Sequence, residues 1–185
     1  MKGISLMNEF KPLPIQDSHR LINAGNVILI SAQSKEKKTI TTVAWHMPVS
    51  NNPKLLSCAL ANKRYSLELI KESKSFCINI PDFAMLDTVI FCGTYSGRTV
   101  DKCKEAHLTA LPCSDIDGFF IAECVAYIEC QLYSMVEAGD HTIIIGQVTC
   151  AHAKIHCFTP DGVIDINKVQ LIHHLGGTHF GILKN

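Results

Sequence analysis

The stretch CVAYIECQLYSMVEAGDHTIIIGQVTC, from Cys124 to Cys150, decides how this chain is expected to fold. Apolar and polar side chains alternate from Cys124 to Tyr133, which is the period of a strand with one buried face. The residues Val136–Asp140 form a turn, and His141–Cys150 reads as a long return strand. Two neighbouring strands joined by a Gly-Asp turn predict an antiparallel pair.

Short apolar segments elsewhere predict further strands at residues 26–31, 39–45, 55–60 and 75–80. Residues 46–53 are expected to form a loop, because their two prolines cannot sit in a central strand. Short helices are expected from Ser66 and over residues 84–92, the second with Gly93 as its C-terminal stop. Strands dominate and no βαβ rhythm is visible. This pattern predicts an antiparallel barrel with a few covering helices.

The bulk composition narrows the class of protein. A chain of 185 residues predicts a single domain spanning residues 1–185. Lys+Arg and Asp+Glu both number 17, so the zero net charge argues against a nucleic-acid or acidic-membrane binder. Low net charge also leaves self-association unopposed.

The chain is expected to be cytoplasmic. No apolar run reaches the roughly 18–20 residues that a membrane span needs, and the N-terminus does not look like a signal peptide. The nine cysteines are expected to be reduced thiols, mostly small core hydrophobes such as Cys58, Cys77, Cys124 and Cys130. Because no Cys-x-x-Cys is present, no metal site is expected.

Two polar stretches carry the chemistry. Asn62-Lys63-Arg64-Tyr65-Ser66 joins an expected strand to an expected helix, and such a corner with two cations, a hydroxyl and free helix N–H groups suits a phosphate. The plain alternative is a capped helix with solvated cations. The second stretch, Cys92 to Arg98, offers a glycine-hinged turn followed by Asp101-Lys102, with a solvated surface turn as its alternative. Together they suggest a phosphorylated cofactor rather than a polymer.

Five motifs then follow one another along the chain: Thr41-Thr42-x-Ala44-Trp45-x-x-Pro48, Asn62-Lys63-Arg64-Tyr65-Ser66-x-Glu68-Leu69-Ile70, Phe76-x-Ile78-Asn79-Ile80-Pro81, Cys92-Gly93-x-x-Ser96-Gly97-Arg98-x-x-Asp101-Lys102 and Gly139-Asp140-His141-x-Ile143-x-Ile145-Gly146-x-Val148. In this order they resemble the flavin reductase-like FMN-binding split-barrel family, and most closely its flavoredoxin branch. The resemblance covers roughly residues 26–152. It implies a mainly β fold, an antiparallel Greek-key split barrel with a few short covering helices, and a homodimer with its sites at the interface.

The resemblance also implies which residues bind the cofactor. Lys63, Arg64 and Ser66 would hold the FMN phosphate, beside Asn62. The segment Thr41, Thr42, Ala44 and Trp45 would border the flavin ring, with His46 on the rim; the alternative is a strand end with a buried tryptophan. Ser96, Gly97, Arg98 and Lys102 would form a second polar cluster. The family usually has an aromatic residue after its Asp-Lys pair, where this chain has Cys103.

His141 is the expected catalytic residue. A lone histidine at the start of a strand is often structural, but in the resembled family this imidazole faces the flavin and helps to orient a nicotinamide. The absence of Gly-x-Gly-x-x-Gly argues against a separate dinucleotide domain, so NAD(P)H would be a transient co-substrate. The expected function is an NAD(P)H:flavin oxidoreductase that passes electrons to free flavin or a partner protein. The alternatives are a flavoredoxin-like electron carrier, which another protein reduces, and a catalytically idle flavin-binding module.

Overall fold

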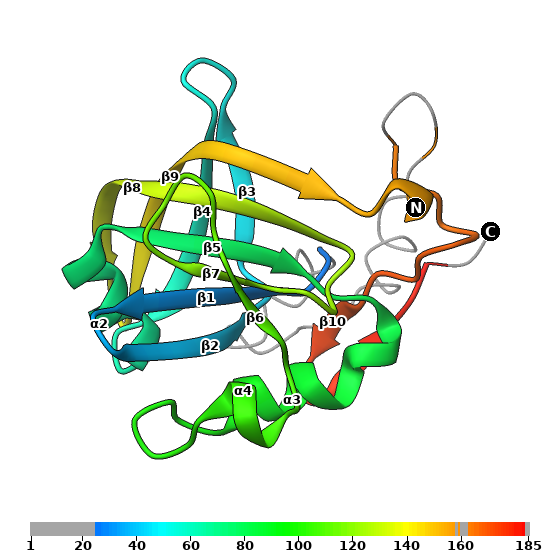
Figure 1. Cartoon of the computed structure of the whole chain (residues 1–185), viewed down its shortest axis with the longest axis horizontal. Coiled ribbons are helices and arrows are strands. Elements are labelled where there is room, and N and C mark those ends of the chain that lie inside the picture. Colours follow the sequence, from blue (N-terminus) through cyan, green and yellow to red (C-terminus); the bar gives the residue numbers. More distant parts are fainter. Residues whose placement is uncertain (1–24, 158, 160–162, 184–185) are drawn as a thin grey trace, which may run out of the picture.

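The computed structural model describes residues 25–157, 159 and 163–183, and its main element is a seven-stranded antiparallel sheet (Figure 1). The strand order is β2-β1-β5-β8-β9-β4-β3. The edge strands β2 and β3 follow one another in the chain with only Ala44 and Trp45 between them, so the sheet curls round into an open barrel. The strands are β1 (Ile28–Ser34), β2 (Lys37–Val43), β3 (His46–Ser50), β4 (Leu55–Ala61), β5 (Ser75–Ile80), β8 (Ala126–Ala138) and β9 (His141–Ala153). The expected mainly β split barrel is confirmed.

The long pair β8–β9 holds the sheet together, as the opening stretch predicts. It pairs from Ala126 opposite Ala153 to Ala138 opposite His141, with register shifts at Glu129/Cys130 and Leu132/Ser134. Such bulges increase the twist and bend of a strand, which helps the sheet to curl. Both strands run further than expected, so the turn shrinks to Gly139 and Asp140. Gly139 has a φ of 62°, a left-handed conformation that favours glycine.

Short helices and two hairpins cover the sheet. The helix α2 contacts β1 and β2, and α3 contacts β2. Figure 1 shows α3 and α4 together beside β2. The helices are α2 (Tyr65–Ser73), α3 (Leu86–Thr94) and α4 (Lys102–Glu105), with 3-10 turns η2 (Phe83–Met85) and η3 (Ile155–Cys157); the hairpins are β6 (Ala110–Pro112) with β7 (Phe119–Ile121) and β10 (His173–Gly176) with β11 (His179–Gly181).

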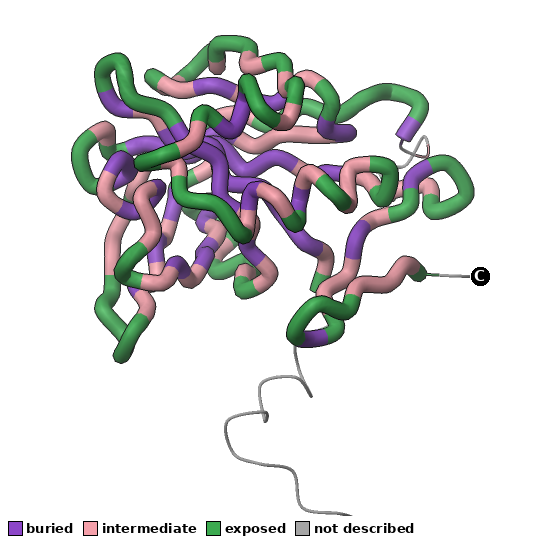
Figure 2. Tube along the Cα trace, turned by 90° about the horizontal axis from the view of Figure 1, so that it is seen from below, coloured by how far each residue is buried: buried purple, intermediate pink, exposed green. Residues whose placement is uncertain are grey.

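Apolar side chains gather on both sides of the sheet. Ile28 and Ile30 of β1 join the core inside the barrel, whereas Leu29 joins a second core under α3 and the β6–β7 hairpin. Because both faces of β1 are buried, its first three residues, Ile28–Ile30, are continuously apolar instead of alternating. Figure 2 shows that the buried residues are concentrated in the middle of the molecule, with exposed residues at the turns.

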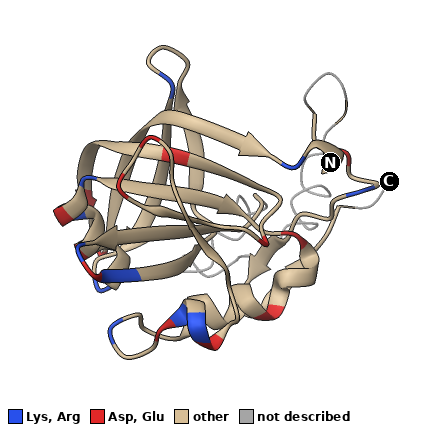
Figure 3. Cartoon of the chain, in the orientation of Figure 1, with Lys and Arg blue, Asp and Glu red and all other residues tan. Residues whose placement is uncertain are grey.

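Charge and cysteine usage agree with a well-packed interior. Lys, Arg, Asp and Glu are interspersed at strand ends and on helices, and most of the sheet carries none of them (Figure 3). All nine cysteines are free thiols, and Cys58, Cys77, Cys124 and Cys130 are buried as expected. None of the helices in the described ranges is long and apolar enough to cross a membrane.

Two expectations about local structure are wrong. Residues 46–50 form the strand β3 rather than a loop. Because β3 lies at the edge of the sheet, it pairs on one side only, and the missing N–H of Pro48 is tolerated there. The expected helix over 84–92 begins at Leu86 after a 3-10 turn, and it continues through Gly93 to Thr94. Gly93 lies inside the helix, where a Cβ would come within 3.3 Å of the Thr42 Cβ, so the glycine allows α3 to approach β2 closely.

Candidate functional site

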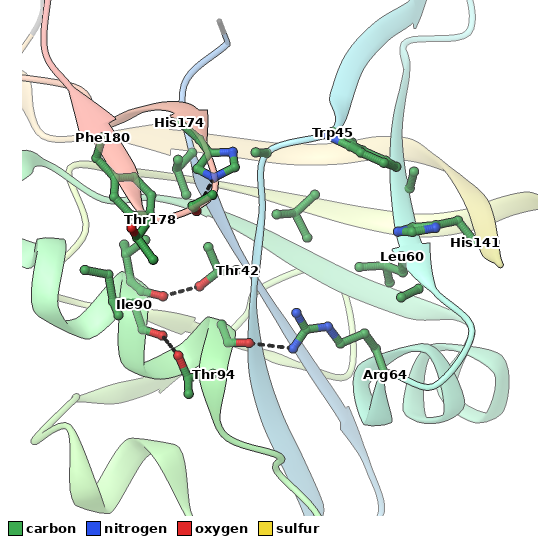
Figure 4. A pocket seen from close by; sticks show the side chains of 18 residues that line it. Thr42, Trp45, Leu60, Arg64, Ile90, Thr94, His141, His174, Thr178 and Phe180 are labelled. Carbon is green, nitrogen blue, oxygen red and sulfur yellow. Dashed lines mark hydrogen bonds between the residues drawn. The ribbon is translucent and has the colours of Figure 1, made fainter. Parts of the chain in front are cut away.

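Two adjoining cavities lie where the end of β4, the start of α2 and the helix α3 meet. The larger has a volume of about 500 Å³ and the smaller about 180 Å³. Arg64 and Thr94 line both cavities, so the two cavities adjoin one another. Figure 4 shows the larger cavity, with Arg64 reaching across its floor toward α3.

The smaller cavity is polar and built around the first turn of α2. No side chain caps the N-terminus of this helix, and the backbone of the N-cap residue Arg64 is extended. Two hydroxyl oxygens, Thr41 Oγ1 and Ser66 Oγ, are buried without a hydrogen-bond partner. A buried unsatisfied hydroxyl is costly unless a ligand or water completes it. This end of the site is therefore built to receive hydrogen-bonding oxygens. Its described lining also includes Thr39, Lys63, Tyr65, Tyr95, Ser96, Gly97 and Lys102.

Lys102 brings a buried positive charge to the smaller cavity. Its side chain is almost wholly buried. The Nζ atom donates hydrogen bonds to the carbonyl oxygens of Ile40 and Cys92, each at a distance of 2.7 Å. Burial, with a contribution from the nearby Arg64 guanidinium, lowers the pKa of Lys102 to about 8. An ammonium group has three N–H donors, so one remains after these two bonds. A bound anion would favour the charged form.

Arg64 lies at the junction of the two cavities. Its Nη1 donates to the carbonyl of Gly93 over 2.7 Å, which holds the guanidinium against the end of α3. The remaining guanidinium donors stay on the side of the cavities. The corner between β4 and α2 and the C-terminal end of α3 are thereby tied together by one cation.

The larger cavity is mainly apolar and has aromatic groups on two opposite sides (Figure 4). On one side, the rings of Trp45 and His141 lie 4.8 Å apart. On the other, His174 and Phe180 of the β10–β11 hairpin lie 5.2 Å apart. Between these walls, the lining comes from the β2–β3 junction, the end of β4 and one face of α3. A flat ring system with apolar faces suits such a space.

His141 begins β9 at the edge of this cavity. Its Nδ1 donates to Asp140 Oδ1 over 2.6 Å, which leaves Nε2 as the nitrogen available to a ligand. The hydrogen bond from His141 holds the pKa of the Asp140 carboxyl below its ordinary value. Because Asp140 is almost fully exposed, we expect this pair to orient the ring more than to stabilise the fold.

The structure brings most of the expected site residues together. Thr42, Ala44, Trp45, Arg64 and His141 line the larger cavity. Thr41, Lys63, Arg64, Ser66, Ser96, Gly97 and Lys102 line the smaller one. Thr42 also donates its hydroxyl to the carbonyl of Val89 over 2.5 Å, so this hydroxyl is used for packing α3.

Three expected residues do not line either cavity. The His46 ring donates through Nε2 to the carbonyl of Asn26 over 2.6 Å. Asn62 accepts from the Thr142 hydroxyl over 2.8 Å and donates to Gly139, so it holds the turn before His141 against the β4–α2 corner. Arg98 pairs with Glu68 over 2.5 Å and lies over the Tyr65 ring.

Several lining residues escaped the sequence reasoning. His174, Thr178 and Phe180 lie outside every motif quoted above. Thr39, Thr94 and Tyr95 lie beside quoted motifs but have no distinguishing spacing. Only the alternation of β2 gave a usable signal, since Thr39 and Thr41 occur on one face of the strand.

The chain is similar to known proteins in sequence and in fold. The model of the flavin reductase like domain matches residues 20–160, which end before β10. An uncharacterized protein of Archaeoglobus fulgidus is 34% identical over 145 residues, covering 78% of this chain and 81% of that protein. A flavin reductase of Pseudomonas putida is 32% identical over 100 residues, covering 54% and 55%. The structure of flavoredoxin from Desulfovibrio vulgaris (Miyazaki F) matches with a TM-score of 0.81, 25% identity and 88% coverage of each chain.

Proposed function

The chain belongs to the flavin reductase-like family, and we propose that it binds FMN and acts as an NAD(P)H:flavin oxidoreductase. The observation that carries the proposal is the pair of unsatisfied hydroxyls, Thr41 Oγ1 and Ser66 Oγ, in the smaller cavity. A phosphate offers several strong acceptor oxygens and a negative charge. It would satisfy both hydroxyls, the uncapped start of α2 and the ammonium of Lys102 together.

The adjoining cavity suits the ring of the same cofactor. Its walls are apolar and aromatic, and the small Ala44 leaves the backbone of the β2–β3 junction accessible. When bound, the flavin would supply the hydride and electron-transfer chemistry. The chain's own residues would position it: Arg64 at the junction of ring and phosphate, Trp45 against the ring region, and the imidazole of His141 where a nicotinamide approaches.

A second candidate function is a flavoredoxin-like carrier, in which bound FMN exchanges electrons with another protein. One observation favours it. Within the described lining of the larger cavity, Arg64 is the only Lys or Arg side chain, and it already donates to Gly93. A dinucleotide carries a pyrophosphate that usually needs cationic or helix N-terminal partners. Support for a nicotinamide donor therefore rests on the family relationship and on His141.

We also propose that the protein is a cytoplasmic homodimer built from a single domain. Trp45, Met47 and Val49 are exposed by 41%, 60% and 43%, and all three lie on or beside the edge strand β3. An exposed apolar edge next to a ligand cavity suits an interface between two copies. The nine free thiols support a reducing compartment.

The proposal is tested by titrating the cofactor-free protein with FMN and with riboflavin, followed by anaerobic addition of NADH or NADPH. We expect FMN to bind more tightly than riboflavin, because only FMN carries the phosphate. Bleaching of the flavin absorbance by either nucleotide at a catalytic rate supports the oxidoreductase. Bound FMN that neither nucleotide reduces supports the carrier. Equal affinity for both flavins would contradict the phosphate assignment.

A further inference from the structure

The β10–β11 hairpin forms a wall of the larger cavity, although it lies outside the residues that match the flavin reductase like domain. The cavity-lining residues of the hairpin are His174, Gly177, Thr178 and Phe180. Figure 4 shows His174, Thr178 and Phe180 on the side opposite Trp45 and His141. Residues within the matched range 20–160 thus supply one aromatic wall, and a segment after that range supplies the other.

The hairpin is held in place by the buried segment that precedes it. The backbone N–H of Val27 donates to the carbonyl of Ile172 over 2.6 Å, and Asn26 forms a bridge with His173. Ile172 is fully buried in the core under α3. Within the hairpin, His174 Nε2 donates to the carbonyl of Gly177 over 2.9 Å. A wall fixed in this way is ready to bind a ligand without reorganisation.

The chemistry of this wall selects the class of ligand. The tilted rings of His174 and Phe180 offer aromatic surface, and Thr178 adds a hydroxyl donor. The described lining of the whole cavity holds no carboxylate, and its single Arg lies at the far end, beside α2. An anion at the hairpin would lack a Lys or Arg partner, whereas a carbonyl oxygen needs only one neutral donor.

We propose that the β10–β11 hairpin is the binding wall for a second ligand of the larger cavity, and that this ligand is a compact, uncharged, planar conjugated carbonyl compound. It would lie against Phe180 and His174, with a carbonyl oxygen near the Thr178 hydroxyl. The cavity volume of about 500 Å³ is within the range of sites for small organic ligands. The inference rests on the proposed function, because the other occupant of the cavity would be the flavin ring.

The test is isothermal titration of 1,4-naphthoquinone into protein saturated with oxidised FMN, with no reductant present. The variant Phe180→Leu keeps an apolar side chain but removes the aromatic face, so the fold of the hairpin is preserved better than with alanine. The control is Leu175→Ala, on the same hairpin but 53% exposed and outside the cavity lining. We expect Phe180→Leu to weaken naphthoquinone binding by about 3- to 10-fold and Leu175→Ala to leave it unchanged.

Two further measurements separate this inference from its premise. FMN affinity is determined first for each variant, and naphthoquinone is then titrated at an FMN concentration that saturates that variant, so that any change in flavin binding is separated from the change in naphthoquinone binding. If wild type binds no FMN, the proposed function fails, and the naphthoquinone titration of the cofactor-free protein still reports on the hairpin. NAD⁺ serves as the rival ligand. Equal naphthoquinone affinity in wild type and Phe180→Leu, or an equal loss of NAD⁺ affinity in that variant, would overturn the proposal.

Discussion

The Nδ1–H of His141 donates to Oδ1 of Asp140 over 2.6 Å, in the two-residue turn between the longest strands of the barrel. The bond selects one tautomer of the imidazole and leaves Nε2 for the cavity. Asn62 holds the same turn from the other side, by donating to the carbonyl of Gly139 over 3.2 Å. A local contact between neighbouring residues thus sets the direction of the expected catalytic side chain.

Replacement of Asp140 by Asn should slow reduction of bound FMN without releasing the cofactor. An amide in place of the carboxylate weakens the hydrogen bond and lets the ring turn, which we expect to lower the rate by about 2- to 10-fold. The measurement is stopped-flow reduction by NADH and by NADPH. Glu137→Gln, which alters an exposed carboxylate on the same hairpin, is the matched control.

His141→Ala should lower the same rate by a few- to about tenfold, and adding Asp140→Asn to it should change nothing further. Non-additivity of this kind would identify Asp140 as a positioning residue that acts through His141. If the two losses multiply, Asp140 acts independently of the imidazole. A loss of several thousandfold in His141→Ala would instead indicate a direct proton-transfer role.

Ser66→Ala should weaken FMN much more than riboflavin, while leaving the cofactor-free protein as stable as wild type or more stable. The reason is that Ser66 Oγ is buried without a partner until a phosphate arrives. Loss of a hydrogen bond to a charged group costs roughly 1.5–3 kcal/mol, or about 10- to 150-fold in Kd. Fluorescence titration gives the Kd values, and urea unfolding gives the stability.

Two variants sharpen the Ser66 experiment. Ser73→Ala, at the other end of α2, should leave both flavin affinities unchanged. Arg64→Ala should also discriminate against FMN, but it should destabilise the cofactor-free protein, because the carbonyl of Gly93 loses its donor. Equal weakening of FMN and riboflavin in Ser66→Ala would mean that the hydroxyl does not contact the phosphate.

The lowered pKa of Lys102 predicts that the affinity for a phosphorylated ligand depends on pH, whereas the affinity for an unphosphorylated ligand does not. Burial lowers the pKa of Lys102 to about 8, so between pH 8 and the ordinary lysine value of 10.5 the folded chain binds fewer protons than the unfolded chain. The contribution of Lys102 to the free energy of unfolding of the cofactor-free protein should therefore increase as pH rises through this window. A bound phosphate favours the charged lysine, so its binding above pH 8 takes up a proton.

The Kd for FMN should consequently rise by about tenfold from pH 7 to pH 9, whereas the Kd for riboflavin should stay nearly constant. The phosphate, with a second pKa of about 6, is already roughly nine-tenths doubly ionised at pH 7, so its own titration changes the Kd little over this range. Lys102→Met should bind FMN more weakly but without the pH dependence. Parallel pH profiles for FMN and riboflavin would show that the Lys102 ammonium does not face the phosphate.

The sequence predicts those elements best whose signals are local. The strand β5 has the expected bounds, because Pro81 stops it directly after Ile80. The strand β3 was missed because a proline is excluded only from central strands, and position in the sheet is a tertiary property. Gly93 was read as a helix stop, whereas its role depends on how closely Thr42 approaches it.

The candidate site likewise contains residues that the sequence predicts and contacts that it does not predict. The motifs around Arg64 and His141 are visible in the sequence, and both residues line the larger cavity. The Glu68 partner of Arg98, by contrast, is 30 residues away, and no sequence pattern distinguishes this ion pair from a ligand contact. The β10–β11 hairpin is held at the site by the bond between Val27 and Ile172 and by the bridge between Asn26 and His173, which join segments far apart in the sequence. Such long-range contacts have no local signal.

Gly97→Ala should destabilise the protein and weaken FMN together. A Cβ at this position would come within 2.6 Å of the Cβ of Thr39, a buried residue of β2, and closer still to its hydroxyl. Because neither backbone can yield freely, the turn that lines the smaller cavity would move away from β2. We expect the free energy of unfolding to fall by about 1–3 kcal/mol, with a loss of affinity that is larger for FMN than for riboflavin.

Gly25→Ala, whose added Cβ would meet nothing within 4 Å, is the matched control. Urea unfolding and flavin titration of both variants provide the comparison. Wild-type stability and FMN affinity in Gly97→Ala would show that the close approach of this turn to β2 is not required for the site.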